Sequence, residues 1–393
     1  MSQSPSLADM EQPVWRRAMG GRESGEGHRA ATPLELLFDL CFVVAVAQAA
    51  ASLHHALSEA HFGSGLLGYA MVFFAIWWAW MNFTWFASAY DTDDVLYRLL
   101  VLVQIAGVLI LAAGVPRAFG EKDFELITLG YVVMRLAMVA LWLRAAREHP
   151  EGRACALRYA IGITAIEVGW IARLALPESL GVAGFLVLVL AELALPLWAE
   201  RYWHTGWNAR HIAERYGLFT LIVLGESVLA ATVAIQAGLD RGIAPTALLS
   251  VAFSGMVIVF AMWWLYFAQP AHRVLTSSRA AFSWGYGHYL IFSSAAAVGA
   301  GLAVSVDYDT HQAHIGALAA RASVAVPVAV FLLSVWFVHV RPHRRGRRMD
   351  AGFTIAGLLV LATPLTPLPL PLIAVVMTGL VLVSLSAPAG RPR

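Results

Sequence analysis

The chain has 393 residues, of which 59% are hydrophobic and only 13% are charged, and its mean hydropathy is +0.68. These values lie outside the range of soluble domains and predict a membrane protein with several spanning helices. A formal net charge of +2 is too small to indicate nucleic-acid binding. The two cysteines, Cys41 and Cys155, lie far apart in the sequence and predict no disulfide framework.

Residues 1–30 are polar and glycine-rich and lack the apolar core of a signal peptide. We expect them to be a disordered cytoplasmic tail, and residues 389–393 to be a second cytoplasmic tail. Between these tails, twelve stretches are apolar over about 20 residues each, enough to cross a hydrocarbon layer of ~30 Å. Prolines interrupt the last two stretches, which form either two spans or one broken hairpin. The stretches predict an all-α polytopic fold with spans at 33–55, 65–89, 93–114, 124–147, 153–174, 178–200, 209–235, 243–268, 279–303, 317–340, 350–366 and 369–387.

The basic residues fall mainly on one side of this predicted membrane. If the N-terminus is cytoplasmic, 18 basic residues lie in the cytoplasmic segments and four, including Lys122, lie in the opposite loops. The positive-inside rule therefore predicts that both termini lie in the cytoplasm.

The chain also resembles itself at an offset of about 180 residues, which indicates an internal repeat. ELLFDLCFVVAVAQ, starting at Glu35, aligns with ERYGLFTLIVLGES, starting at Glu214. We therefore expect two six-helix repeats, at 31–200 and 201–388. Because six is an even number, the two repeats would be parallel, with a site expected at their interface.

The first stretch carries two carboxylates, Glu35 and Asp39, on one face of a helix. A charge near the bilayer centre costs roughly 2.5 to 3.5 kcal/mol, so such groups usually face a polar interior. Thr32 and Glu35 form a capping-box pattern, so Glu35 is expected to cap the helix start. Asp39 lies one turn deeper, where we expect either pairing with an arginine or a functional role.

Polar residues of other stretches fall at a similar depth. Both signs of charge occur over many helices, which predicts either a hydrated vestibule or a closed ion-pair network. At 1.5 Å per helical residue, the members of this layer lie within about 8 to 15 Å of the cytoplasmic face. They are Asp39, Arg98, Glu192, Glu214, Arg215 and His288, and deeper in the spans lie Gln48, Arg135, Glu167 and Glu226.

The stretch at 209–235 is the richest in polar groups. His211 and Glu214 have the i, i+3 spacing of some carboxylate metal sites, but the same spacing is common in hydrogen-bonded surface pairs, and we predict no metal. Glu226 lies deep in the span beside Gly225, which would allow close helix approach. Nothing in its own helix can neutralise Glu226, so it either exchanges protons or lies neutral in a tight helix interface.

Three aspartates, Asp91, Asp93 and Asp94, precede the third stretch. We expect Asp91 and Asp94 to clamp Arg98, while acidic residues also suit a helix start. The letters Asp-x-Asp-Asp match the acid motif of protonation-initiated terpenoid cyclases, and such a cluster can hold Mg²⁺ against a diphosphate.

Aromatic residues gather near the cytoplasmic ends of the second and eighth stretches. They form either an interfacial belt or an aromatic wall around an organic substrate or cation. The main members are Trp77, Trp78, Trp80, Trp263, Trp264 and Tyr266.

PLELLFDLCFVVAVAQ, the run ending in YDTDDVLYRLL, and HIAERYGLFTLIVLGES resemble the bacterial low temperature requirement A (LtrA) family over most of residues 30–305. The resemblance implies a multi-pass inner-membrane protein. The family name comes from a cold-growth phenotype and implies no molecular activity. The residues that match the motifs are Glu35, Phe38, Asp39, Asp91, Asp93, Asp94, Arg98, His211, Glu214, Arg215, Gly225 and Glu226.

Two functions fit these patterns, and a purely structural role has no use for the buried carboxylates. One is an intramembrane enzyme that acts on a prenyl or other lipid-soluble substrate, with Asp91, Asp93 and Asp94 as acids beside the aromatic wall; only this alternative calls for Mg²⁺. The favoured one is passage of an ion or small solute, gated by protonation of Asp39 and Glu226. Its expected path comprises Asp39, Arg98, Glu192, His211, Glu214, Arg215, Glu226 and His288.

Overall fold

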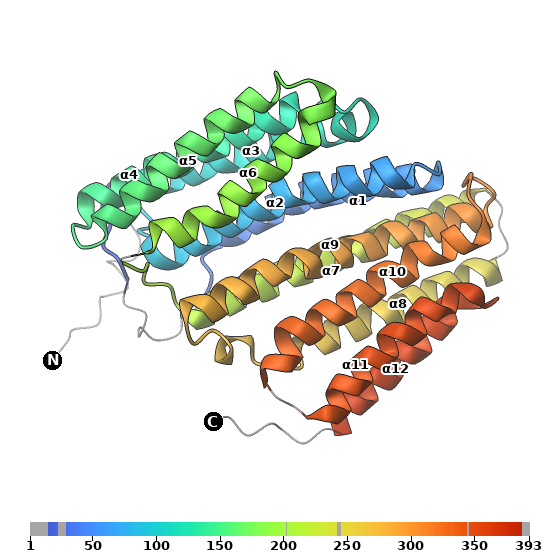
Figure 1. Cartoon of the computed structure of the whole chain (residues 1–393). Coiled ribbons are helices and arrows are strands. Elements are labelled where there is room, and N and C mark those ends of the chain that lie inside the picture. The colour runs from blue at the N-terminus through green and yellow to red at the C-terminus, as the bar shows by residue number, and fades with distance from the viewer. Residues whose placement is uncertain (1–14, 23–28, 202, 242–244, 344–345, 387–393) are drawn as a thin grey trace.

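The protein is described here by a computed structural model covering residues 15–22, 29–201, 203–241, 245–343 and 346–386. Within these residues twelve helices are long and apolar enough to cross a membrane, which confirms the predicted all-α polytopic fold (Figure 1). The predicted tail 389–393 and residues 1–14 lie outside the described part. The helices are α1 Pro33–Ser58, α2 Phe62–Tyr90, α3 Val95–Gly120, α4 Glu125–Glu148, α5 Arg153–Arg173, α6 Glu178–Ala199, α7 Ala209–Asp240, α8 Pro245–Phe267, α9 Ser278–Asp309, α10 Ala317–Val335, α11 Arg347–Ala362 and α12 Pro369–Ser386.

The proline-rich stretch near the C-terminus forms two helices, not one broken hairpin. Pro364 lies in the short 3-10 segment Thr363–Leu365, and Pro369 begins α12. Proline is tolerated at these positions because it lacks only an N–H that a helix start leaves unbonded. The start of α1 and the end of α12 lie at the same end of the bundle, which we call the termini end (Figure 1).

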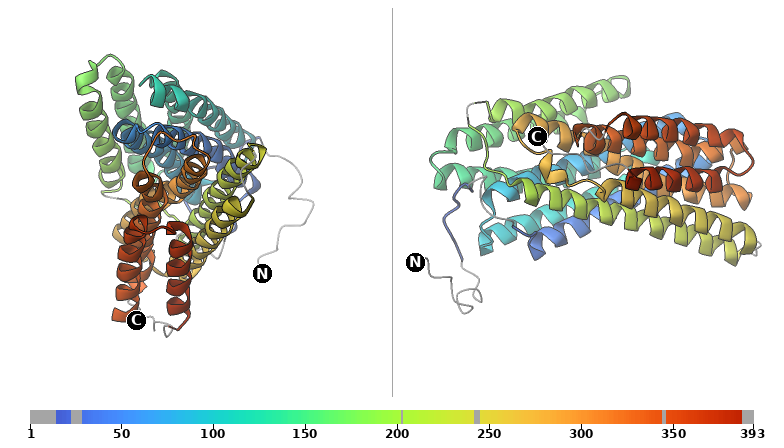
Figure 2. Two further views of the ribbon diagram at one scale, coloured as in Figure 1. Left: turned by 90° about the vertical axis from the view of Figure 1, so that its right-hand side faces the viewer. Right: turned by 90° about the horizontal axis from the view of Figure 1, so that it is seen from below.

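The helices form two groups of six that meet along α1, α2, α7 and α9 (Figures 1 and 2). In the first group α1 packs against α3, α3 against α4, α4 against α5, and α5 against α6. In the second group the same order holds, with α7 against α9, α9 against α10, α10 against α11, and α11 against α12. This shared order is what a repeat would produce, although the repeat itself stays a prediction.

Part of the segment expected to be a disordered tail lies against the termini end. Met19 is fully buried, and its N–H donates to Glu148 at 2.7 Å. Arg16 forms an ion pair with the same carboxylate, and the N–H of Arg17 donates to Asp94 at 2.8 Å. The loops and helix ends of the first group therefore bind residues that precede α1.

Glycines allow the closest helix contacts within each group. A Cβ atom added to Gly130 of α4 would lie 2.5 Å from the carbonyl oxygen of Gly107 in α3. One added to Gly299 of α9 would lie 2.7 Å from the Cα of Ser227 in α7. At Gly225 nothing lies within 4 Å of such an atom, so the close approach predicted there is wrong and occurs two residues later, at Ser227.

We expect Gly130→Ala to lower the free energy of unfolding by about 1–3 kcal/mol, because the new methyl group forces α3 and α4 apart. Gly225→Ala is the matched control: it meets open space and should be neutral or slightly stabilising, since alanine favours a helix. Equilibrium unfolding in mixed micelles measures both. Equal stability of the two variants would contradict the packing described.

Candidate functional site

A fully buried ion pair joins the two groups near the termini end. Arg215 of α7 approaches Asp39 of α1 with two nitrogens, Nη2 at 2.6 Å from Oδ1 and Nε at 3.2 Å from Oδ2. Trp80 of α2 donates its indole N–H to the same Oδ1 at 2.7 Å. All three side chains are 0% exposed. Of the two alternatives predicted for this layer, Asp39 therefore lies in a closed ion-pair network.

Glu35 belongs to the same network. Its Oε1 lies 2.9 Å from Nη1 of Arg215 and 3.1 Å from Nε2 of His211. Its Oε2 accepts from the backbone N–H of Thr32 at 2.8 Å and lies 3.2 Å from Arg29. The predicted capping box is confirmed, but the cap is only part of the role of this carboxylate. We call Glu35, Asp39, His211 and Arg215 the α1–α7 cluster.

Two helix starts hold this cluster in place. Thr32 caps α1, with Pro33 at its first position, and so fixes the direction of Glu35 one turn later. Asn208 caps α7 by accepting from the N–H groups of Arg210 and His211. The residues that meet in the cluster lie in the first two turns of these capped helices.

The three aspartates before α3 each bind a different arginine. Asp91 pairs with Arg29, and Asp93 pairs with Arg98 at 2.8 Å on the surface. Asp94 caps α3. The predicted clamp of Asp91 and Asp94 on Arg98 is therefore wrong. That prediction placed Asp91, Asp94 and Arg98 on one continuous helix, whereas α3 begins only at Val95.

Asp94 is fully buried, and Arg144 of α4 binds it through two nitrogens. Its carboxylate also accepts from the N–H groups of Tyr97 and Arg17, at 2.9 and 2.8 Å. Burial alone would raise the pKa of Asp94, but these hydrogen bonds outweigh it and lower the pKa below the usual value.

Glu192 lies in the first group, away from Asp39. Its oxygens accept from Trp78 at 2.8 Å and from Tyr131 at 2.9 Å, and it pairs with Arg135. Glu167 of α5 is 6% exposed, and both of its carboxylate oxygens lack a hydrogen-bond partner among the described residues. The predicted polar layer is therefore divided into separate clusters.

A cavity of about 370 Å³ lies between α7, α8 and the chain around His339, near the termini end. Its polar lining includes Arg210, Glu214 and His272. His339, also in the lining, lies in a π-helical turn and approaches Nε2 of the buried His288 with its own Nε2 at 3.3 Å. Tyr266 lies 3.0 Å from the same nitrogen. Two predicted path residues, Glu214 and His288, thus lie at or just behind this cavity.

Glu226 lies deep in α7, and its side chain is partly exposed on the surface of the bundle. No hydrogen bond or ion pair joins it to another described residue. It does not lie in a tight helix interface, which was one of the two expectations for it.

A model of the bacterial low temperature requirement A family matches residues 30–387. The chain belongs to this family. A similar protein is an uncharacterized protein of Rhizobium meliloti (strain 1021), 29% identical over an alignment of 264 residues that covers 64% of this chain. The match spans 61% of the length of that relative. The family assignment and the twelve helices together establish an integral membrane protein.

The aromatic residues of this LtrA protein do not form one wall. Trp78 and Trp80 are fully buried and Trp77 nearly so, so an interfacial belt on α2 is excluded. Trp263 and Trp264 of α8 are 43% and 42% exposed, as expected for residues that face lipid. Beside them runs an apolar groove between α7 and α8. Tyr266, the third predicted aromatic residue of α8, is instead buried and points toward His288.

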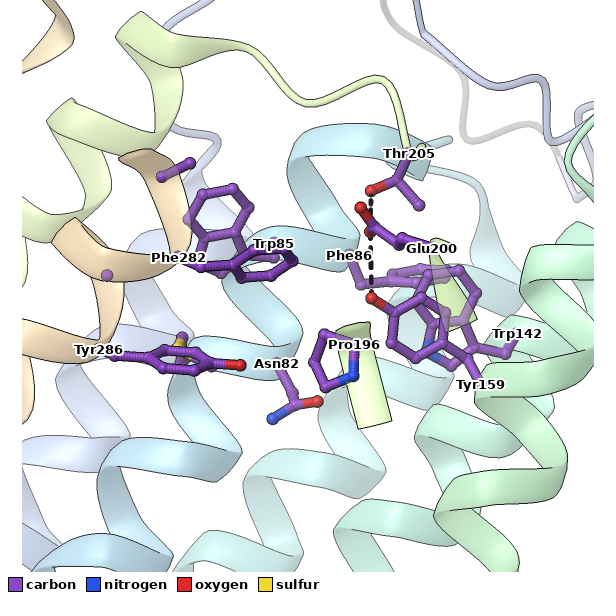
Figure 3. Close-up of a pocket in the computed structure, with 13 residues that line it drawn as sticks. Asn82, Trp85, Phe86, Trp142, Tyr159, Pro196, Glu200, Thr205, Phe282 and Tyr286 are labelled. Carbon is purple, nitrogen blue, oxygen red and sulfur yellow. Dashed lines mark hydrogen bonds between the residues drawn. The ribbon is translucent and has the colours of Figure 1, made fainter. Parts of the chain in front are cut away.

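Aromatic side chains also surround a crevice between the groups at the termini end (Figure 3). Trp85, Tyr159 and Tyr286 are among its lining residues, and Glu200 accepts from Tyr159 at 3.0 Å and from Thr205 at 2.6 Å. Burial raises the pKa of Glu200. The crevice has a volume of about 40 Å³, enough for a few waters but far below the roughly 300–1,000 Å³ of a ligand pocket.

Among the described residues, no group of three histidine, cysteine, aspartate or glutamate side chains is arranged to hold a metal ion. His211 and Glu214, which have the spacing of some metal sites, have different partners: His211 contacts Glu35, and Glu214 accepts from the N–H of Ala31.

Sequence reasoning missed several members of these clusters. The partner of Asp39 was in the predicted layer, but Trp80 was assigned to a wall and Glu35 to a cap. Arg135 and Glu167 were noted only for their depth. Both are charged residues on the buried face of a spanning helix, and this pattern is the sequence signal that could have identified them.

We expect Arg215→Met to lower the free energy of unfolding by about 3–5 kcal/mol, because it leaves Asp39 and Glu35 buried without a counter-charge. Arg98→Met is the control, since it breaks an exposed pair and should cost less than about 1 kcal/mol. Unfolding in mixed micelles at neutral pH compares them. If both variants lost a similar amount of unfolding free energy, the buried α1–α7 cluster would contribute no more to stability than an exposed ion pair.

We expect Asp94 to contribute an acid-sensitive part of the stability. Because its pKa is lowered by folding, its contribution is complete above the usual carboxyl pKa of about 4 and is lost as the pH falls through the lower, folded value. The stability of the parent should therefore decline more steeply below about pH 4 than that of Asp94→Asn. Asp93→Asn, at an exposed pair, should follow the parent, and parallel curves for all three would refute the assignment.

Proposed function

We propose that this LtrA protein mediates passage of an ion or small solute across the membrane, gated by protonation of Asp39 and Glu226. The observation that carries the proposal is the α1–α7 cluster, in which fully buried charges join the two six-helix groups. Buried ion pairs stabilise little compared with apolar packing. An ion pair at this boundary therefore suits a contact that must break during gating.

Protonation changes this contact directly. A proton on Asp39 removes one of the two charges that hold Arg215, and the other, on Glu35, is shared with His211 and Arg29. The boundary between α1 and α7 then loses one of its two ion pairs to Arg215. Such a charge-dependent contact is a two-state element of the kind that gating requires.

The cavity of about 370 Å³ supports an entry from the termini end. Its lining contains both signs of charge, and His339 connects it to the buried His288 and Tyr266. The arginine distribution favours a cytoplasmic location for this end. We therefore propose cytoplasmic termini, an inner-membrane location, and a cytoplasmic entry.

Glu226 supports the proposal from deeper in the membrane. It is an unpaired carboxyl within the described residues, about 25 Å along α7 from its start at 1.5 Å per residue. A carboxyl at such a depth is a functional candidate by default.

The enzyme alternative has less support. Each aspartate of Asp-x-Asp-Asp is bound by an arginine, and the aromatic crevice is too small for a prenyl chain. We therefore retain passage as the proposed function.

The test is flux in liposomes that contain the purified protein, under imposed pH, Na⁺ and K⁺ gradients and read with pH-sensitive and potential-sensitive dyes. We expect flux above that of protein-free liposomes and a flattened pH dependence in Glu226→Gln. Asp39→Asn should carry flux that no longer requires acid, because asparagine mimics the protonated carboxyl. Glu121→Gln, at an exposed loop, is the control and should match the parent.

Because Asp39→Asn also weakens a structural contact, each variant is first checked for a monodisperse elution profile and a cooperative unfolding transition. No flux in the parent under any gradient, together with unchanged behaviour of the folded Asp39 and Glu226 variants, would end the proposal.

A further inference from the structure

Three buried ionisable side chains meet between α4, α5 and α6, inside the predicted membrane layer. They are Arg135, Glu167 and Glu192, and none is more than 6% exposed. We call them the α4–α6 cluster. It lies wholly within the first helix group, apart from the α1–α7 cluster at the boundary.

The surroundings of Glu192 suit an ionised carboxylate. Trp78 and Trp170, which can only donate, give their indole N–H groups to it at 2.8 and 3.3 Å. Tyr131 donates at 2.9 Å, and its own oxygen accepts from Arg135 at 2.8 Å. Every group around this carboxylate is therefore a donor, and Arg135 is its counter-charge.

The surroundings of Glu167 are the opposite. Neither of its oxygens accepts a hydrogen bond in the described part of the chain. Its helix packs against α4 and α6, and the charged groups of these helices that act on it are Arg135 and Glu192. Arg135 already neutralises Glu192. The cluster thus holds two carboxyl groups and one guanidinium.

If both carboxyl groups were ionised, the cluster would bury a net negative charge in the bilayer, which is strongly unfavourable. One positive charge must therefore be taken up. We infer that the α4–α6 cluster binds one exchangeable proton and that Glu167 carries it. This site goes beyond the proposed function, because it exists whether or not a solute crosses the membrane.

Because Arg135 acts on both carboxyl groups, release of the proton changes the contacts within the cluster. Its Nε and Nη1 lack hydrogen-bond partners, so the guanidinium has donors to spare for a second carboxylate. When Glu167 releases its proton to water, it becomes that second carboxylate. Arg135 is then shared between two anions, and its hold on Glu192 and Tyr131 weakens.

The test is infrared difference spectroscopy of the full-length protein in lipid nanodiscs during a pH change. A protonated carboxyl has a carbonyl stretching band that a carboxylate lacks, and ¹³C-labelled glutamate shifts it. We expect a glutamate band at neutral pH that is lost at alkaline pH in the parent and in Glu121→Gln, and is absent in Glu167→Gln.

Thermal unfolding supplies a second measurement. Glutamine mimics a neutral carboxyl, so Glu167→Gln should leave the melting temperature unchanged, whereas Glu192→Gln should lower it. The inference is overturned if Glu167→Gln keeps the band, if it is as damaging as Glu192→Gln, or if Na⁺ or K⁺ displaces the band at constant pH. Absent flux with an intact band would count against the proposed function alone.

Discussion

The contact between Asp39 and Arg215 is the one on which the rest of the arrangement depends. Lipid cannot solvate either charge, so the two helices that carry them must meet at one depth and with one rotation. This requirement brings α1 against α7 and places Trp80 of α2 over the same carboxylate. The boundary between the two groups is therefore set by a polar contact.

The need to neutralise charges also explains the ion pairs at the termini end. Three aspartates there would repel one another, yet each has its own arginine, and Arg29 comes from the segment before α1. Because Arg29 contacts both Asp91 and Glu35, the segment connects the α2–α3 loop to the α1–α7 cluster. A part of the chain that looks like a polar tail thus completes a buried site.

The sequence was sufficient for the twelve spans, because each depends on the composition of its own segment. It also placed Asp39 and Arg215 at one depth, since depth follows from position within a span. Partners depend on helix rotation and on which helices are neighbours, which no single segment encodes. The predicted clamp of Asp91 and Asp94 on Arg98 was wrong for a local reason, because α3 begins only at Val95 and helical spacing does not extend back to them. Glu35 was underestimated because a local pattern, the capping box, already explained it.

The two clusters differ in how a movement between the groups affects them. Such a movement separates Asp39 from Arg215, but it leaves the packing of α4, α5 and α6 unchanged. Aromatic residues connect the two regions: Trp78 of α2 donates to Glu192, and its ring lies 5.7 Å from that of Tyr286 in α9. Tyr286 in turn donates to the carbonyl of Leu193 in α6 at 3.1 Å. Tyr286 of α9 therefore contacts both the indole that donates to Glu192 and the backbone of α6, and these contacts join the α4–α6 cluster to the boundary between the groups.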